Sequence, residues 1–229
     1  PGDPLPRIEC PPGYTASVYA QGLRSPDGLA FSPSGLLHVA EERAGRVSQI
    51  GPTGQITPVV DGLNSPEGIA FDDTGNLYVV EDVEDGRLIQ VDPAGSRSTL
   101  ASGLEAPEGV AWTPDGTLYV TESNSQYADN PLDLRTHVTR VSPGGQVSRI
   151  ITDTPVISGL MIAAWSYAGI TPGSDGQLYV TNELSGLEIT RTVVLLPGIL
   201  TATMTLSTTD SVFVVDPQAG ERTLLASNL

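Results

Sequence analysis

Residues 65–81 read SPEGIAFDDTGNLYVVE, and this stretch decides the fold because similar stretches recur along the chain. The other copies begin at Ser25, Ala106 and Ser166. The residues before the glycine that all copies share are Asp27, Glu67, Glu108 and, in the fourth copy, Ala168. These positions are separated by 40, 41 and 60 residues. A period near forty residues is typical of stacked supersecondary units, and the longer last interval indicates inserted residues.

Each copy reads as four short strands, as the second copy illustrates. An apolar strand follows the Pro-Glu-Gly step, the turn at Asp73-Thr74-Gly75 reverses the chain, and LYVV forms a second strand. A third strand begins at Arg87 (RLIQV) and a fourth at Ser96 (SRSTLA). Four antiparallel strands per repeat, without a helical period, predict an all-β chain built from β-propeller blades.

The repeat, over about residues 15–229, resembles the NHL-repeat type of β-propeller. It is also similar to the gluconolactonase, senescence-marker and paraoxonase-like propellers. The resemblance rests on the succession PxGIAF, GNLYVxE, RI and D in the units. Those propellers usually have about six blades, whereas four complete blades are visible here. Thr15–Gln21 (TASVYAQ) aligns with the fourth strands and is predicted to be an outer strand without a blade of its own.

We therefore predict that the four blades belong to a six-bladed ring, completed by further blades of a longer protein or by a second chain. The alternative is a self-sufficient ring of four blades. The incomplete ring is favoured because a free outer strand and an exposed last edge promote aggregation. Residues 1–14 form a proline-rich segment before a single domain of residues 15–229, with insertions expected at 123–136 and 186–210.

The composition limits the partners of this protein. The 27 Asp and Glu residues outnumber the 11 basic residues, all of which are arginine, and the formal net charge is -16. An acidic surface repels phosphate backbones and anionic lipids, so we expect no nucleic-acid partner. We also expect no membrane insertion, because the chain lacks a run of about 18 apolar residues. Cys10 either is an unpaired thiol or pairs with a cysteine outside this sequence.

Asp27, Glu67 and Glu108 are the strongest candidates for a functional site. The first strand of each blade lines the channel of a propeller, so residues at one fixed position of successive blades meet around the axis. Three converging carboxylates repel one another unless a hard cation holds them, and Ca²⁺ accepts about six to eight oxygen ligands. The resemblance to lactonase propellers also implies calcium at this position, although Ala168 departs from the pattern. The alternative is that each acidic residue favours the tight step into its strand and stays solvated.

A second ring of polar residues follows the second strands. Its members are Glu41, Glu81, Glu122 and Asn182. We expect them to line the channel, or else only to end their strands. His38 takes the place of a tyrosine in the other copies, which predicts a packing role, and His137 opens a third strand. No GxSxG, HExxH or paired CxxC motif occurs, so serine hydrolases, zincins and zinc ribbons are not supported.

The two insertions are candidate binding surfaces. Residues 189–206 carry Pro197-Gly198 between two apolar arms, which predicts a β-hairpin with a type II turn. Docking on another subunit would use Val193, Leu195, Leu196, Ile199, Met204 and Leu206. The alternative is a hairpin that packs on its own blade. The polar loop 123–136 is either solvated or gates a ligand beside the channel.

Two functions remain, and we favour the first. It is an extracytoplasmic binding or scaffold propeller, bacterial and secreted, that acts in protein assembly and has room for a small-molecule ligand in its channel. The location is inferred from the composition and the proline-rich start. The second function is a calcium-dependent lactonase or related hydrolase, in which a channel metal polarises a carbonyl oxygen and a carboxylate activates water. Binding is preferred because the ring of ligands is incomplete and no proton-transfer residue stands out.

Overall fold

A computed structural model describes residues 10–129, 133–154, 156–158, 161–163, 166–182, 192–195, 200–203 and 211–227. In this part of the chain the regular structure is β-strand, apart from short 3-10 turns such as Glu42–Ala44, so the predicted all-β class is confirmed. Over the same residues, no helix has the length and apolar character needed to cross a lipid bilayer.

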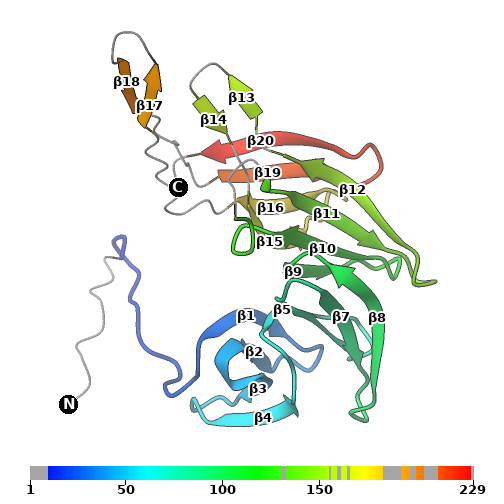
Figure 1. Cartoon of the computed structure of the whole chain (residues 1–229). Coiled ribbons are helices and arrows are strands. Elements are labelled where there is room, and N and C mark those ends of the chain that lie inside the picture. Colours follow the sequence, from blue (N-terminus) through cyan, green and yellow to red (C-terminus); the bar gives the residue numbers. More distant parts are fainter. Residues whose placement is uncertain are drawn as a thin grey trace.

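Four antiparallel sheets of four strands each form the blades (Figure 1). The first blade contains β1 (Pro26–Phe31), β2 (Leu37–Glu41), β3 (Arg46–Ile50) and β4 (Ile56–Asp61). The second contains β5 (Pro66–Phe71), β6 (Leu77–Glu81), β7 (Gly86–Val91) and β8 (Arg97–Leu104). The third contains β9 (Pro107–Trp112), β10 (Leu118–Ser123), β11 (Thr136–Val141) and β12 (Val147–Asp153). The fourth contains β15 (Tyr167–Pro172), β16 (Leu178–Asn182), β19 (Ser211–Asp216) and β20 (Glu221–Ser227).

The blades follow one another along an arc, with their first strands on its inner side (Figure 1). Neighbouring first strands contact each other, β1 with β5, β5 with β9, and β9 with β15. This arrangement confirms the predicted blades and their order around an axis. The total of six blades stays a prediction.

Short polar side chains fix the turn between the first and second strands. Asp72 Oδ1 accepts hydrogen bonds from the backbone N–H groups of Thr74 and Asn76, both at 2.9 Å, and Tyr78 Oη donates to Asp72 Oδ2 at 3.0 Å. Burial and the hydrogen bond to this carboxylate raise the pKa of Tyr78 to about 12. An aspartate turn of this kind returns the chain into the second strand in register.

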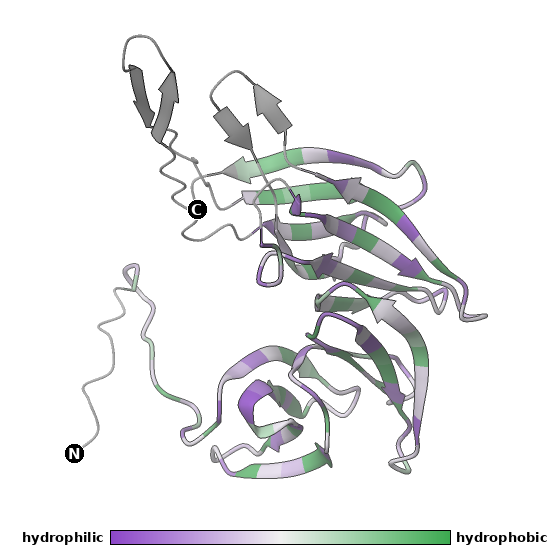
Figure 2. Ribbon diagram, viewed as in Figure 1, coloured by the Kyte–Doolittle hydropathy of each residue, from purple (hydrophilic) through white to green (hydrophobic). Residues whose placement is uncertain are grey.

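Apolar side chains fill the spaces between neighbouring blades. Successive residues of a strand point to opposite faces, so each blade can pack against both of its neighbours. The three resulting cores include Val47 with Val79, Val80 with Val120, and Val138 with Val180. All six of these valines are fully buried. Figure 2 shows the apolar residues distributed along the strands of the blades.

The segment Thr15–Gln21 is not a strand, which corrects the prediction of an outer strand there. A strand needs a neighbouring backbone to complete its hydrogen bonds, and none of the described sheets pairs with this segment. Its side chains are mostly exposed, and Tyr19 Oη donates to Gly51 O at 3.2 Å. Gly22 nevertheless has a φ of 95°, similar to Gly62 and Gly103 in the later repeats, so the link into the first blade keeps the repeat conformation.

The inserted residues form two additional hairpins outside the blade sheets. β17 (Thr192–Leu195) pairs with β18 (Leu200–Thr203), placing Val193 opposite Ala202, as the hairpin prediction requires. Among the proposed interface residues, Leu196, Ile199, Met204 and Leu206 lie outside the described residues. The second hairpin, β13 (Val156–Ser158) with β14 (Met161–Ala163), follows β12 and precedes β15 in the sequence and was not predicted.

Candidate functional site

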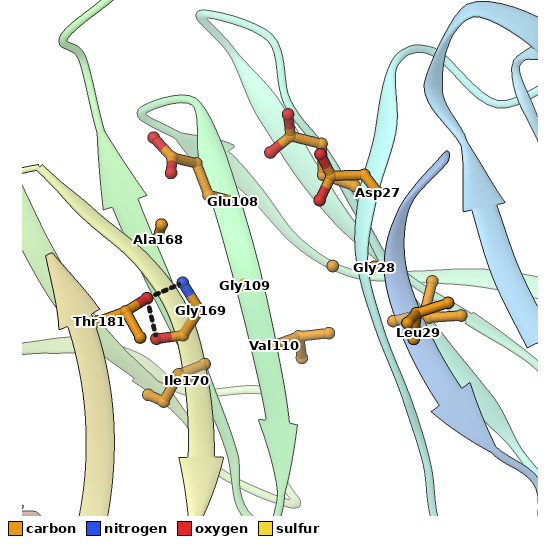
Figure 3. A pocket seen from close by; sticks show the side chains of 13 residues that line it. Asp27, Gly28, Leu29, Glu108, Gly109, Val110, Ala168, Gly169, Ile170 and Thr181 are labelled. Carbon is orange, nitrogen blue, oxygen red and sulfur yellow. Dashed lines mark hydrogen bonds between the residues drawn. The ribbon is translucent and has the colours of Figure 1, made fainter. Parts of the chain in front are cut away.

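A pocket of about 390 Å³ opens where the first strands of the four blades meet. Three of the residues that line it are the acidic residues at the equivalent positions of successive blades, Asp27, Glu67 and Glu108. Figure 3 shows Asp27 and Glu108 at one end of this pocket and the apolar side chains of Leu29, Val110 and Ile170 at the other. We call it the axial pocket, and it has an acidic end and an apolar end.

The glycine after each acidic residue is required by close packing of the first strands. A Cβ on Gly28 would lie 2.3 Å from the backbone oxygen of Glu67. A Cβ on Gly68 would lie 2.5 Å from the backbone oxygen of Glu108. These separations are far shorter than a carbon and an oxygen tolerate, so only glycine fits. The Pro-Glu-Gly step therefore lets neighbouring strands approach each other and brings their acidic side chains to the axis.

Crowding of carboxylates changes the protonation of Glu67. Burial is the main cause, and the nearby charges of Asp82, Asp27, Glu108 and Glu42 add to it, so the pKa of Glu67 rises to about 9. The pKa of Asp27 is also raised, by burial and by Glu42. With no counter-charge, Glu67 keeps its proton at neutral pH. A cation in the pocket would favour the ionised form and release this proton.

Two of these acidic neighbours, Glu42 and Asp82, were missed in the sequence analysis. Each directly follows the acidic residue that ends a second strand. The adjacent acidic residues Glu41-Glu42 and Glu81-Asp82 are therefore the sequence feature that could have predicted them. Asp82 is 7% exposed, and Gln126 Nε2 of the 123–136 loop donates a hydrogen bond to its Oδ2. Burial raises the pKa of Asp82. The loop is thus attached directly to the acidic cluster.

The second polar ring does not line the axial pocket, which corrects that part of the prediction. Its members Glu41, Glu81, Glu122 and Asn182 are buried inside their blades. Each accepts a hydrogen bond from the backbone N–H of the link that leads into its own first strand, donated by Arg24, Asn64, Glu105 and Ser166 respectively, at 2.7 to 2.8 Å. The ring therefore fixes the link between blades.

Arginines of the third and fourth strands neutralise the three glutamates of this ring. Arg46 Nε lies 2.6 Å from Glu41 Oε1, and Arg87 Nη2 lies 2.7 Å from Glu81 Oε2. Arg149 Nη2 lies 3.1 Å from Glu122 Oε2. Burial alone would raise the pKa of Glu41, but hydrogen bonds from Arg46, Ser48 and the Arg24 N–H outweigh it and lower that pKa. Buried carboxylates paired in this way are structural.

The links between blades have a strained backbone that the ring supports. Ser25, Ser65 and Ala106 have φ values of 46°, 49° and 46°, in the left-handed region that non-glycine residues rarely adopt. Their carbonyl oxygens accept hydrogen bonds from backbone N–H groups at the end of each second strand, donated by Glu42 at 3.0 Å, Asp82 at 2.9 Å and Ser123 at 3.1 Å. This link places the following acidic residue at the axis with the same geometry in each blade.

The acidic end of the axial pocket has the charge to attract a cation, but its side chains are not arranged as a preformed metal site. Four carboxyl groups surround Glu67, which favours any positive charge placed among them. Among the described residues, however, no three His, Cys, Asp or Glu side chains are grouped closely enough to hold a metal ion.

Neither histidine belongs to the axial pocket. His38 is buried, its Nδ1 lies 3.0 Å from Leu36 O, and its ring packs edge-on against Phe71 at 4.8 Å between centroids. Burial lowers the pKa of His38. His137 is buried at the start of β11, where its Nδ1 lies 2.9 Å from Thr152 Oγ1. His38 thus has the packing role that its position in the repeat indicates.

Comparison with solved structures decides the fold. The chain matches virginiamycin B lyase from Staphylococcus aureus with a TM-score of 0.52 and 16% sequence identity, over 86% of this chain and 54% of the lyase. It matches a gluconolactonase from Xanthomonas campestris with a TM-score of 0.53 and 17% identity, over 89% of this chain and 76% of that enzyme. The chain has the gluconolactonase-like β-propeller fold.

This propeller spans about half the length of the lyase it matches. No protein family model matches the sequence, and no curated protein matches it. Identities of 16 and 17% show a shared fold alone. One propeller fold carries many activities, so the function has to be argued from the residues of the axial pocket.

Proposed function

We propose that this protein is a binding propeller whose axial pocket holds a cation. The main evidence for this proposal is the environment of Glu67. Burial and four nearby acidic side chains together raise its pKa to about 9. Keeping these groups together costs free energy in the absence of a counter-charge. A bound cation removes this cost, and its binding is coupled to ionisation of Glu67.

Calcium is the probe for this proposal, because carboxylate oxygens are its preferred ligands. In isothermal titration calorimetry we expect the wild type to bind Ca²⁺ with a dissociation constant of about 1 mM or tighter. Glu67→Gln should weaken binding at least about tenfold. Asp73→Asn, which changes an exposed acidic residue in the β5–β6 turn, is the matched control and should bind like the wild type. Absence of binding, or equal binding by Glu67→Gln, would contradict the proposal.

A calcium-dependent hydrolase of the lactonase type is the second candidate. It is favoured by the placement of the three carboxylates at the channel and by the fold shared with a gluconolactonase. The described residues supply neither a three-ligand metal site nor a histidine at the pocket. The test is lactone hydrolysis with calcium added: turnover that is lost in Glu67→Gln supports an enzyme, and no turnover supports binding alone.

We also propose that the propeller acts in a protein assembly, through the open face of its first blade. Leu29 and Phe31 of β1 are 64% and 69% exposed. The equivalents of Leu29, Ile69 of β5 and Val110 of β9, are 6% and 5% exposed because a preceding blade covers them. The equivalents of Phe31, Phe71 and Trp112, are partly buried. An exposed apolar face of this kind can pack against another blade, which would come from a second chain or from a longer form of this protein.

Light scattering tests the assembly. Phe31→Glu should leave the melting temperature nearly unchanged, because the side chain is already exposed, while it removes self-association or co-purification of a second chain. A large fall in melting temperature with unchanged assembly would contradict this role. The proposed extracytoplasmic location is tested by fractionating the source cells and detecting the protein with an antibody.

A further inference from the structure

A second pocket, of about 410 Å³, opens on the exposed face of the first blade. Its lining residues include Phe31 of β1, Leu37 of β2, Ile50 of β3 and, from the chain before β1, Tyr19. We call it the edge pocket. None of its lining residues lines the axial pocket. The edge pocket is therefore a separate feature, and it belongs to the face that no other blade covers.

The same positions of the repeat line a closed counterpart of this pocket between the second and third blades. That pocket also has a volume of about 410 Å³. The residues that correspond there to Tyr19, Phe31, Leu37 and Ile50 are Leu100, Trp112, Leu118 and Val141. The edge pocket is thus one part of a pocket that the repeat builds elsewhere from two neighbouring blades.

The counterpart shows which strands the edge pocket lacks. Its remaining wall belongs to the second blade and includes Asp72 of the β5–β6 turn, Tyr78 of β6 and Gln90 of β7. These residues come from the first turn, the second strand and the third strand of the preceding blade. Leu100 comes from the fourth strand, β8, and its equivalent Tyr19 is present in the edge pocket. The contribution of the first three strands is missing, and that of the fourth is already there.

Tyr19 has the position of a fourth-strand residue relative to the first blade. A Cβ on Gly54, in the β3–β4 turn, would lie 2.4 Å from Tyr19 O. At the junction of the third and fourth blades, a Cβ on Gly220, in the β19–β20 turn, would lie 2.8 Å from Ile150 O of β12. Ile150 is the equivalent of Tyr19 in the repeat. The same close approach therefore occurs where a fourth strand passes the next blade.

The backbone of Thr15–Gln21 is free to pair with another strand. This segment belongs to none of the described sheets, and Figure 1 shows most of the chain before β1 lying apart from them. The link that follows it is nevertheless formed as in the later blades, since Arg24 N donates to Glu41 Oε2 at 2.8 Å and Ser25 has a φ of 46°. An unpaired segment held in place at one end is a template for an incoming strand.

These observations define what covers the open face of the first blade. An intact blade of a second copy does not fit, because each described blade sheet already has its fourth strand and that strand needs the place of Tyr19. Leu29 and Phe31, 64% and 69% exposed, require an apolar surface against them. We propose that this face docks a three-stranded antiparallel β-sheet from outside this chain, whose third strand pairs with Thr15–Gln21. The inference rests on the proposed assembly role and adds the kind of partner.

The test is the binding of a three-stranded probe to the full chain. The probe consists of residues 65–95, the second blade without its fourth strand, fused to a soluble carrier protein, because these strands already pack on the third blade in this way. The control probe, residues 65–104, adds the fourth strand. In analytical ultracentrifugation we expect the three-stranded probe to bind with a dissociation constant of about 100 µM or tighter, the four-stranded probe at least about fivefold more weakly, and the carrier alone not at all.

Two proline variants of the full chain test the strand pairing. Pro58 lies in β4, opposite Ser48, at the position that corresponds to Val18, so a paired fourth strand accepts proline there. The N–H of the adjacent position points the other way, toward the third strand. Ser17→Pro should therefore weaken binding of the three-stranded probe at least about fivefold, whereas Val18→Pro should stay within about twofold of the wild type. Neither variant should change the melting temperature of the chain alone, because the segment is in no described sheet.

The proposal is overturned if the three-stranded probe does not bind, if the four-stranded probe binds equally well, or if the two proline variants have the same affinity. Assembly by copies of the chain alone, lost in Phe31→Glu and unaffected by Ser17→Pro, would assign the open face to a second copy; it would support the proposed assembly role and overturn this inference. An assembly that Phe31→Glu leaves intact would contradict the assembly role itself. The two proposals therefore fail through different results.

Discussion

Replacing Glu67 by Gln is expected to stabilise the protein at neutral and alkaline pH. Glutamine has nearly the shape of a neutral carboxyl group and cannot ionise. Burial and the surrounding carboxylates raise the pKa of Glu67 from 4.5 to about 9 in the folded protein. Between these values the folded chain holds a proton that the unfolded chain has released. The free energy of unfolding of the wild type therefore falls as pH rises, by up to about 1.4 kcal/mol per pH unit.

At neutral pH the raised pKa of Glu67 lowers the free energy of unfolding of the wild type by at most about 3 kcal/mol. Solvent around the partly exposed side chain reduces this loss to about 1 to 3 kcal/mol. Urea unfolding at about pH 4, pH 7 and pH 9, with a chelator present, measures it. The variant and the wild type should be equally stable near pH 4, and the advantage of the variant should grow with pH. A constant difference, or a less stable variant near pH 9, would refute the reasoning.

Three further changes test other parts of the structure. Gly68→Ala places a Cβ about 2.5 Å from Glu108 O, so we expect a loss of about 2 kcal/mol or more in urea unfolding, against little change for Gly144→Ala, whose Cβ would meet no atom closer than 3.9 Å. Glu122→Gln weakens one of the two acceptors of Arg149, which keeps its ion pair with Glu105 at 3.1 Å, and should cost about 1 to 3 kcal/mol; an unchanged unfolding midpoint would show that the polar ring does not hold the links. Val193→Glu combined with Met204→Glu should abolish assembly and leave the melting temperature nearly unchanged if the hairpin is an interface, whereas a large fall in melting temperature would assign it to packing on its own blade.

The sequence repeat was sufficient to predict the blades and the order of their strands, because each strand and turn depends on local signals. Asp72 and its neighbours illustrate this, since the turn they form is closed by contacts within a few residues. The same register also brought Asp27, Glu67 and Glu108 to one pocket. A fixed position in each repeat becomes a fixed position around the axis.

Features that depend on contacts between distant residues were not predictable in this way. Glu41 and its equivalents were expected in the channel, but the backbone of the links and the arginines of the third and fourth strands hold them inside the blades. The contact between Gln126 and Asp82 joins residues 44 positions apart, and no periodicity indicates it. The strand expected at Thr15–Gln21 also failed, because a strand depends on a neighbouring edge as well as on its own sequence.

The coupling of cation binding to proton release tests the central claim most directly. Calcium is titrated into the wild type and into Glu67→Gln at about pH 7, in two buffers that differ in ionisation enthalpy, so that the difference in heat counts the protons released. The account predicts that the wild type releases close to one proton per calcium bound, since the cation ionises a carboxyl group whose pKa is otherwise about 9. It predicts almost none for Glu67→Gln. Calcium binding without proton release by the wild type, or no calcium binding, would contradict the claim that this acidic pocket is built for a cation.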